Sequence, residues 1–171
     1  LMAVHPHIQV ELRLTERRTN IIGDRVDLAI RMGALEDSEL IARWLTSISR
    51  VAVASKSYLE RAGHPSHPGE LNKSDCLIIR RALSVWRFDK GLDIPLKWRI
   101  AAGNMLVARD LAASGNGITI LPRFLVEDDL AAGRLTPVLA DFPLPDAPAW
   151  IVATRQKHRS PAVRAVMDHL V

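Results

Sequence analysis

The sequence predicts an α/β protein with a largely parallel sheet and two lobes. Segments with strand and helix patterns alternate along the 171 residues, as expected when helical crossovers join parallel strands. Two stretches, "VASKSYL" and "PLPDAPAW", are typical of linkers between lobes. The C-terminal segment carries an apolar stripe that needs a sheet to cover. We therefore expect a discontinuous first lobe, residues 1–54 with 150–171, and a second lobe, residues 55–149.

The first part of the chain predicts strands joined by a short crossover. "IQVELRL" (8–14) alternates apolar and polar residues, which is typical of a half-buried strand. A short helix or turn is expected over 15–24. "VDLAIR" (26–31) is apolar enough to predict a strand buried on both faces, parallel to the first. Residues 41–55 predict one bent strand or two.

The middle of the chain alternates in the same way. Ser55 near the start and Gly63 at the end mark a short helix over 55–63. A proline-rich loop follows, and strands are predicted at "CLIIR" (76–80) and "PLKWRIAA" (95–102).

The last third begins with a helix over 103–117, with Asn104 as its N-cap and Gly115 in its C-terminal turn. The final helix, 160–171, has Ser160 as N-cap and Pro161 at its first position. Between them we predict strands at 118–122, 134–139 and 149–154, a helix at 123–133 and an extended connector at 141–148.

Composition excludes several classes of protein. The net charge of +4 is far below that of a nucleic-acid-binding surface, and the pairs Arg17-Arg18 and Arg80-Arg81 are interpreted as solvated surface. The single cysteine, Cys76, rules out an internal disulfide framework, fits a reducing compartment and is expected to be buried packing. There is no membrane-length apolar run and no signal-peptide pattern. These features predict a cytoplasmic protein without a membrane partner.

The sequence contains no pattern that predicts catalysis or metal binding. The six histidines show no metal-ligand spacing with Cys, Asp or Glu, and there is no nucleophile elbow or phosphate-binding loop. "GNG" (115–117) is better explained as a turn. Glu127, Asp128 and Asp129 are consecutive, so they are interpreted as a solvated face rather than a catalytic pair. We therefore predict no enzyme activity, no cofactor and no metal.

Binding geometry leaves one candidate site open. "RMG" (31–33) follows a predicted buried strand, and open α/β sheets bind ligands at the carboxyl ends of their strands. The helix that begins at Asn104 offers free N–H groups to an anion. Alternatively, Arg31 is a rim residue in an ion pair and Asn104 is only a cap. The sequence alone does not decide between these interpretations.

Several segments resemble the effector-binding domain of LysR-type transcriptional regulators. They include "HPHIQVELRLTERRTNIIGDRVDLAIRMGALEDSELIARWL", "RVAVASKSYLERAGHPSHPGEL", "WRF", "LAASGNGITILPRFLVEDDLAAGRLTPVL" and "SPAVRAVMDHLV". The resemblance covers nearly the whole chain. Its strength comes from the number and order of the segments, because no single motif decides it.

The resemblance implies a two-lobed fold like that of periplasmic binding proteins (type 2), with two crossovers and a small, often anionic effector in the cleft. It also implies a homodimer or homotetramer. The residues that it places at the effector site are Arg31, Met32, Gly33, Gly103, Asn104, Met105, Leu121, Pro122 and Phe124.

Two departures from the family pattern follow from the same comparison. The winged helix-turn-helix of the family lies upstream, so we expect operator DNA to be bound only through a domain absent from this chain. The first strand of the effector domain is also expected to be missing from lobe I. A free-standing solute-binding protein of a transport system is the alternative function. A hydrolase or transferase has no nucleophile–base pair to support it.

Overall fold

The computed structural model describes residues 1–15, 20–21, 23–35 and 39–171. The chain forms two compact units. Unit 1 comprises Leu1–Ser47 and Ala147–Val171, and unit 2 comprises Ile48–Asp146. The sequence-based boundaries lay after residues 54 and 149. The structure places 48–54 in unit 2, because a strand in this segment pairs with two strands of that unit, and 147–149 in unit 1.

Unit 1 is built on a three-stranded sheet in the order β1-β10-β2. Strand β1 is Ala29–Met32, β2 is Ile41–Ile48 and β10 is Ala147–Ala153. Strands β1 and β10 are antiparallel. Two helices follow β10, namely α4 (Arg155–His158) and α5 (Pro161–Leu170).

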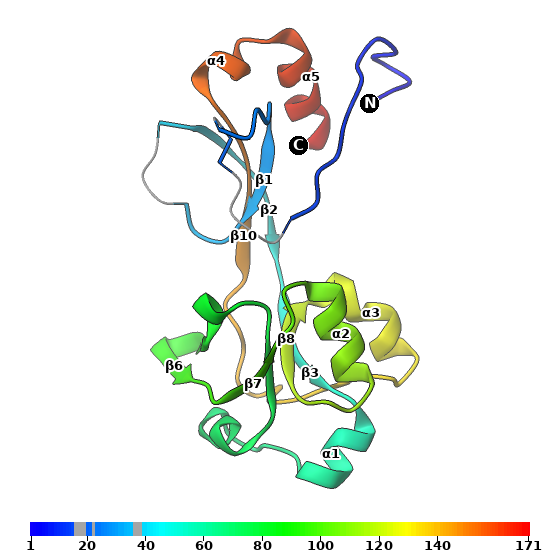
Figure 1. The fold of residues 1–171 in the computed structure, drawn as a ribbon, viewed down its shortest axis with the longest axis vertical. Coiled ribbons are helices and arrows are strands. Elements are labelled where there is room, and N and C mark those ends of the chain that lie inside the picture. Colours follow the sequence, from blue (N-terminus) through cyan, green and yellow to red (C-terminus); the bar gives the residue numbers. More distant parts are fainter. Residues whose placement is uncertain (16–19, 22, 36–38) are drawn as a thin grey trace. The chain divides into compact units, whose positions relative to one another are not determined.

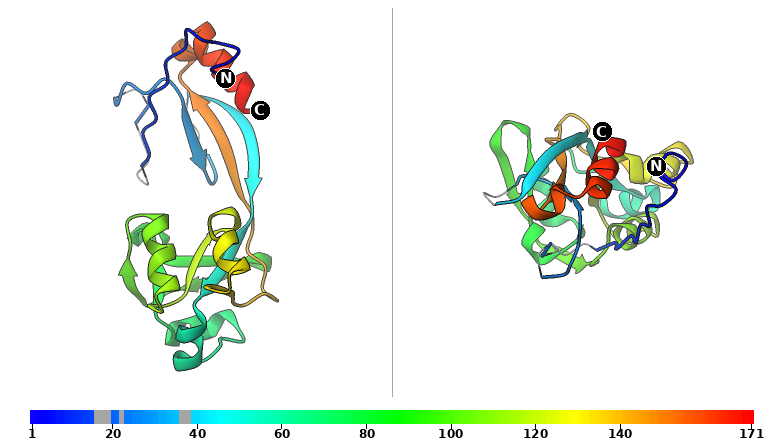
Figure 2. Two further views of the ribbon diagram at one scale, coloured as in Figure 1. Left: turned by 90° about the vertical axis from the view of Figure 1, so that its right-hand side faces the viewer. Right: turned by 90° about the horizontal axis from the view of Figure 1, so that it is seen from above.

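Helix α5 covers the sheet of unit 1 with its apolar stripe. Val163 and Met167 are buried against Ile151 and Ala153 of β10. In Figure 2 the helix, drawn in red, lies beside β10, drawn in orange. Proline occupies the first turn, as predicted. The prediction that the C-terminal stripe needs a sheet to cover is confirmed, and burial of these apolar side chains stabilises unit 1.

The predicted strand at 8–14 is wrong. These residues have no regular secondary structure, and Leu12 and Leu14 are 83% and 97% exposed. Alternation favours a strand only where a neighbouring strand supplies hydrogen-bond partners, and none of the described strands pairs with this segment. The crossover predicted over 15–24 lies partly outside the described residues.

The strand predicted at 26–31 is shorter and less buried than expected. Only Ala29–Met32 forms β1, and its residues alternate between half-buried and exposed. It is therefore not buried on both faces. Its partner is the antiparallel β10, which returns from the far end of the sequence, and not a parallel strand at 8–14.

Unit 2 contains the remaining elements (Figure 1). Its helices are α1 (Lys56–Ala62), α2 (Met105–Ala113) and α3 (Arg123–Ala131), with 3-10 turns at 68–73, 81–83 and 89–91. Its strands are β3 (Arg50–Ala54), β4 (Cys76–Ile78), β5 (Val85–Phe88), β6 (Leu92–Pro95), β7 (Trp98–Ala101), β8 (Thr119–Pro122) and β9 (Thr136–Pro137).

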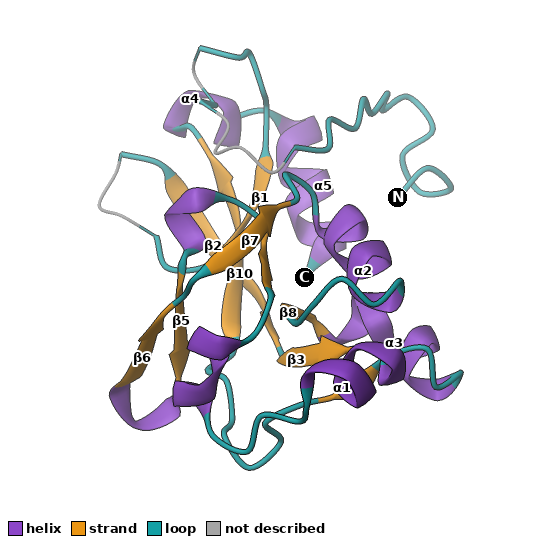
Figure 3. Cartoon of the chain, turned by 60° about the horizontal axis from the view of Figure 1, so that its bottom comes forward, coloured by secondary structure: helices purple, strands orange, loops and turns teal. Residues whose placement is uncertain are grey.

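The strands of unit 2 run in both directions. Strands β4 and β7 are parallel, and a parallel bridge between Cys76 and Ile118 joins β4 to the start of β8. Strand β3 is antiparallel to β8 and β9. Strands β5 and β6 form an antiparallel hairpin (Figure 3). The expectation of mainly parallel sheets is therefore wrong. Strand β3 follows β2 after a single residue, so no crossover helix reverses the chain before it pairs.

Local signals account for the helices of unit 2. The Ser55 hydroxyl accepts the Tyr58 N–H at the start of α1, and Gly63 ends that helix with positive φ. Two apolar clusters hold the unit together. In one of them α2 and α3 pack on the sheet, with Ala108, Leu121 and Val126 buried. The connector that ends the unit is held by Arg50, whose Nε and Nη2 donate to the Pro145 carbonyl at 2.9 and 2.5 Å.

The "GNG" turn allows two backbone segments to approach each other closely. Gly117 has φ +148°, and a Cβ built on it would lie 2.2 Å from the carbonyl oxygen of Asp75. The next residue, Ile118, donates its N–H to that same oxygen at 2.9 Å. The glycine is therefore required so that β4 and β8 can meet, a close approach that the interpretation of "GNG" as a turn did not anticipate.

We predict that Gly117→Ala lowers the free energy of unfolding by about 2–4 kcal/mol, which combines left-handed strain and overpacking. The matched control is Gly133→Ala, since Gly133 also has positive φ (+68°) but nothing within 4 Å of its Cβ position. That variant should lose only about 1–2 kcal/mol. Urea unfolding measures both values, and equal losses would show that contact with Asp75 is unimportant.

Candidate functional site

Three strands of unit 2 end at one edge: β7 is parallel to β4, and an isolated parallel bridge joins β4 to the start of β8. We call residues 79–81, 102–104 and 122–124, which follow β4, β7 and β8, the carboxyl edge. Pairing continues past β7, because the Gly103 N–H donates to the Ile79 carbonyl at 2.8 Å. Open α/β sheets bind ligands at the carboxyl ends of their strands. The edge is therefore the part of unit 2 where a ligand is expected.

Asn104 caps helix α2, as predicted. Its Oδ1 accepts the N–H of Leu106 at 2.7 Å and the N–H of Val107 at 3.3 Å. The expectation that the N–H groups after Asn104 are free is therefore wrong for these two groups. The cap satisfies the donors that the first turn leaves without an intrahelical partner. A ligand at this edge must obtain most of its polar contacts from other groups.

The other site residues predicted in unit 2 differ in exposure. Leu121 is fully buried in the core with Val51 and Val53, and Pro122 is also buried. Because these two residues are buried, they belong to the core that underlies the carboxyl edge and are not part of its exposed surface. Phe124, in the first turn of α3, is 64% exposed. Met105, at the start of α2, is half-buried.

The site residues predicted in unit 1 lie at the end of β1. Arg31 is half-buried and stands opposite Trp150 of β10. Met32 is exposed. Gly33 has φ +97°, which explains the glycine, and its N–H donates to the Pro148 carbonyl at 2.8 Å. The sequence had indicated that Arg31 lies at the carboxyl end of a parallel strand. The structure differs, because β1 is antiparallel to β10.

The sequence did not indicate that arginines gather at the carboxyl edge. The pair Arg80-Arg81 directly follows β4, and Arg123 begins α3. The Arg81 guanidinium lies 5.5 Å from the centroid of the Trp98 ring, which is a cation–π distance. A pair of arginines carries little signal in a sequence, and only the strand pairing shows that this pair is next to the start of α2.

Asp129 corrects the interpretation of the acidic cluster. Glu127 and Asp128 are exposed, but Asp129 is buried. Its carboxylate lies 2.6 Å from Nε of Arg134 and 3.7 Å from Nε of Arg109 in α2. The pair with Arg109 connects the middle of α2 to the C-terminal part of α3, and the pair with Arg134 holds the chain that follows α3.

Cys76 is buried, and burial raises the pKa of its thiol to about 12. The cysteine is therefore a packing residue, as predicted, because a thiol with so high a pKa forms little thiolate nucleophile at neutral pH. Within the described ranges, no group of three or more His, Cys, Asp or Glu side chains could hold a metal ion.

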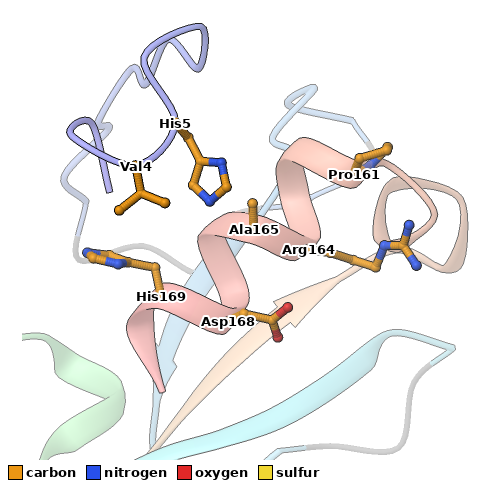
Figure 4. A pocket seen from close by; sticks show the side chains of 7 residues that line it. All are labelled: Val4, His5, Pro161, Arg164, Ala165, Asp168 and His169. Atoms are coloured by element: carbon orange, nitrogen blue, oxygen red, sulfur yellow. The ribbon is translucent and has the colours of Figure 1, made fainter.

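A shallow pocket lies elsewhere, on helix α5 of unit 1. It has a volume of about 430 Å³ and is lined by Val4, His5, Pro161, Arg164, Ala165, Asp168 and His169. Figure 4 shows that Val4 and His5 come from the N-terminal segment and the others from α5. None of the predicted effector residues lines it. Its acid, Asp168, already forms an ion pair with Arg43 at 2.6 Å.

Comparison with known proteins identifies the chain. The sequence profile of the LysR substrate binding domain matches residues 1–171. The chain belongs to the LysR substrate-binding domain family. A transcriptional regulator of Xanthomonas campestris pv. campestris is 33% identical over 181 residues, which cover 99% of this chain and 52% of that protein. The regulator CrgA of Neisseria meningitidis is 36% identical over 141 residues, 80% of this chain and 47% of CrgA.

Solved structures of LysR regulatory domains have the same fold. The CrgA regulatory domain superposes with a TM-score of 0.87 at 32% identity, covering 99% of this chain and 86% of that one. The AphB regulatory domain of Vibrio vulnificus gives 0.80 at 26% identity, with coverage of 99% and 86%. The predicted fold class of LysR regulatory domains, with two lobes like those of periplasmic binding proteins, is confirmed.

This LysR substrate-binding domain spans about half the length of the curated relatives it matches. Those relatives are described as transcriptional regulators, so nothing supports the alternative of a transport protein. Among the helices that the structure describes, none is both long and apolar enough to cross a membrane.

The connection between α2 and α3 generates a stability prediction. Asp129→Ala should lower the free energy of unfolding by about 2–3 kcal/mol. A fully buried pair loses about 3–5 kcal/mol, but Arg134 remains partly in water. The matched control is the exposed neighbour, Asp128→Ala, which should change stability by less than about 0.5 kcal/mol. Similar losses in thermal and urea unfolding would show that the ion pairs do not connect the helices.

Proposed function

We propose that this chain is the effector-responsive part of a LysR-type transcriptional regulator. It binds a small organic anion and modulates transcription through operator DNA, which a separate upstream helix-turn-helix domain contacts. The regulator acts in the cytoplasm as a homodimer or homotetramer and is not an enzyme. The observation that carries the proposal is the family match over residues 1–171, together with relatives described as HTH-type regulators.

The proposal names residues for effector binding in each unit. In unit 1, Arg31 supplies a guanidinium that donates charge-assisted hydrogen bonds, and Met32 and Gly33 provide the adjacent surface. In unit 2, the start of α2 and the start of α3 contact the rest of the molecule. The residues concerned there are Gly103, Asn104, Met105, Pro122 and Phe124, with Leu121 holding Pro122 from the core.

The role of Arg31 predicts a loss of affinity on substitution. A charge-assisted hydrogen bond contributes about 1.5–3 kcal/mol, so Arg31→Ala should weaken effector binding roughly ten- to a hundredfold. The measurement is calorimetric titration of the full-length protein in which this chain occurs. The effector is first chosen by a melting-temperature screen of organic acids.

The controls separate binding from stability. Because Arg31 is half-buried, the melting temperature of each variant is measured without effector, and Arg31→Lys keeps the charge while losing the planar fork. Arg155→Ala removes an exposed cation of α4 and should bind as the natural protein does. Equal affinities of the natural protein and Arg31→Ala would show that Arg31 is only a rim residue.

A further inference from the structure

Most arginines of unit 2 have a partner for their guanidinium. Arg87 pairs with Asp93 and Arg99 pairs with Asp75. The others with partners contact a carboxylate, a carbonyl oxygen or an aromatic ring: Arg50, Arg61, Arg81, Arg109 and Arg134. Among the residues that the structure describes, the guanidinium groups of Arg80 and Arg123 have no such partner.

These two arginines share one location, the carboxyl edge. The parallel bridge joins Cys76 to Ile118. From this bridge the two chain segments run in the same direction, so Arg80, two residues after the end of β4, and Arg123, the first residue of α3, both follow strands that end at this edge. Single exposed arginines are commonly solvated. Two like charges at one edge without a carboxylate create a positive potential that favours an anion. A guanidinium also matches the geometry of an oxyanion better than an ammonium does.

Apolar side chains are exposed at the same edge. Leu106 and Val107, in the first turn of α2, are 47% and 46% exposed, and Phe124 in the first turn of α3 is the most exposed of the three. Side chains on a helix lean toward its N-terminus, which here means toward the carboxyl edge. Cations and apolar surface therefore occur together where α2 and α3 begin, and α2 packs against α3.

We propose that Arg80 and Arg123 bind the oxyanion group of the effector, and that Phe124, Leu106 and Val107 contact an apolar body attached to it. The ligand class is thus an organic oxyanion with an apolar group, rather than a small, wholly polar acid. This inference rests on the proposed function and assigns the anion contact of unit 2 to arginine side chains, since the N–H groups of Leu106 and Val107 are occupied by Asn104.

The test uses the full-length protein and four probes in calorimetric titration. Phenylacetate carries the charge and the apolar body, acetate only the charge, and phenylacetamide only the body. Phenyl phosphate distinguishes a phosphate from a carboxylate as the preferred oxyanion. We expect phenylacetate or phenyl phosphate to bind at least tenfold more tightly than both acetate and phenylacetamide.

Single-residue variants show which side chains cause the preference for probes that carry both a charge and an apolar body. Arg80→Gln and Arg123→Gln should each weaken binding of the better probe about tenfold, the effect of losing one charge-assisted hydrogen bond. Arg80→Lys should lose less. Phe124→Ala should weaken phenylacetate but not acetate. The control is Arg87→Gln, which removes an exposed arginine of β5 outside the carboxyl edge and should leave every affinity unchanged.

Two results would overturn the inference. One is that the natural protein binds phenylacetate and phenyl phosphate no more tightly than it binds acetate or phenylacetamide. The other is unchanged affinity in both Arg→Gln variants, whose exposed side chains make misfolding a poor explanation once melting temperatures are shown to be equal. If Arg31→Ala weakens the effector found by screening while Arg80→Gln and Arg123→Gln do not, the proposed function stands and this inference fails.

Discussion

Backbone hydrogen bonds on both sides of β4 determine what lies at the carboxyl edge of unit 2. On one side Gly103 donates to Ile79, and on the other Leu77 donates to Ile118, each at 2.8 Å. The close approach on the second side depends on Gly117. Because β4 is parallel to both neighbours, three chain segments emerge together. The chain just before α2 thereby lies beside Ile79, the neighbour of Arg80, and α3 begins at the same edge, directly after β8.

Features with local causes were predicted from the sequence. The helix starts at Ser55 and Asn104 follow from side-chain caps, and the buried stripe of α5 follows from helical periodicity. Strand pairing is not local, and there the sequence was less informative. Residues 8–14 alternate as a strand does but have no partner strand in the described structure. The direction of β3 depends on how the chain enters unit 2, which no residue pattern encodes.

At the candidate site, too, local features were predicted from the sequence and tertiary contacts were not. Asn104 was predicted both as a cap and as the start of an anion site, and its side chain occupies the N–H groups that the second role required. Of three consecutive acids only Asp129 is buried, because only it reaches Arg109 and Arg134. Arg80 looked like surface charge, since its significance comes from strand register. The sequence therefore pointed to residues that lie at the carboxyl edge. Tertiary contacts, which the sequence does not show, determine which side chains there remain available to a ligand.

The central claim is that an organic oxyanion with an apolar group binds at the carboxyl edge of unit 2. Hydrogen–deuterium exchange of the full-length protein, measured with and without saturating phenylacetate, tests it most directly, because bound ligand slows exchange of the amides that it covers or orders. The account predicts added protection concentrated in residues 79–81, 103–107 and 122–124. Protection confined to the α5 pocket, around His5 and His169, with no change at the carboxyl edge, would contradict it.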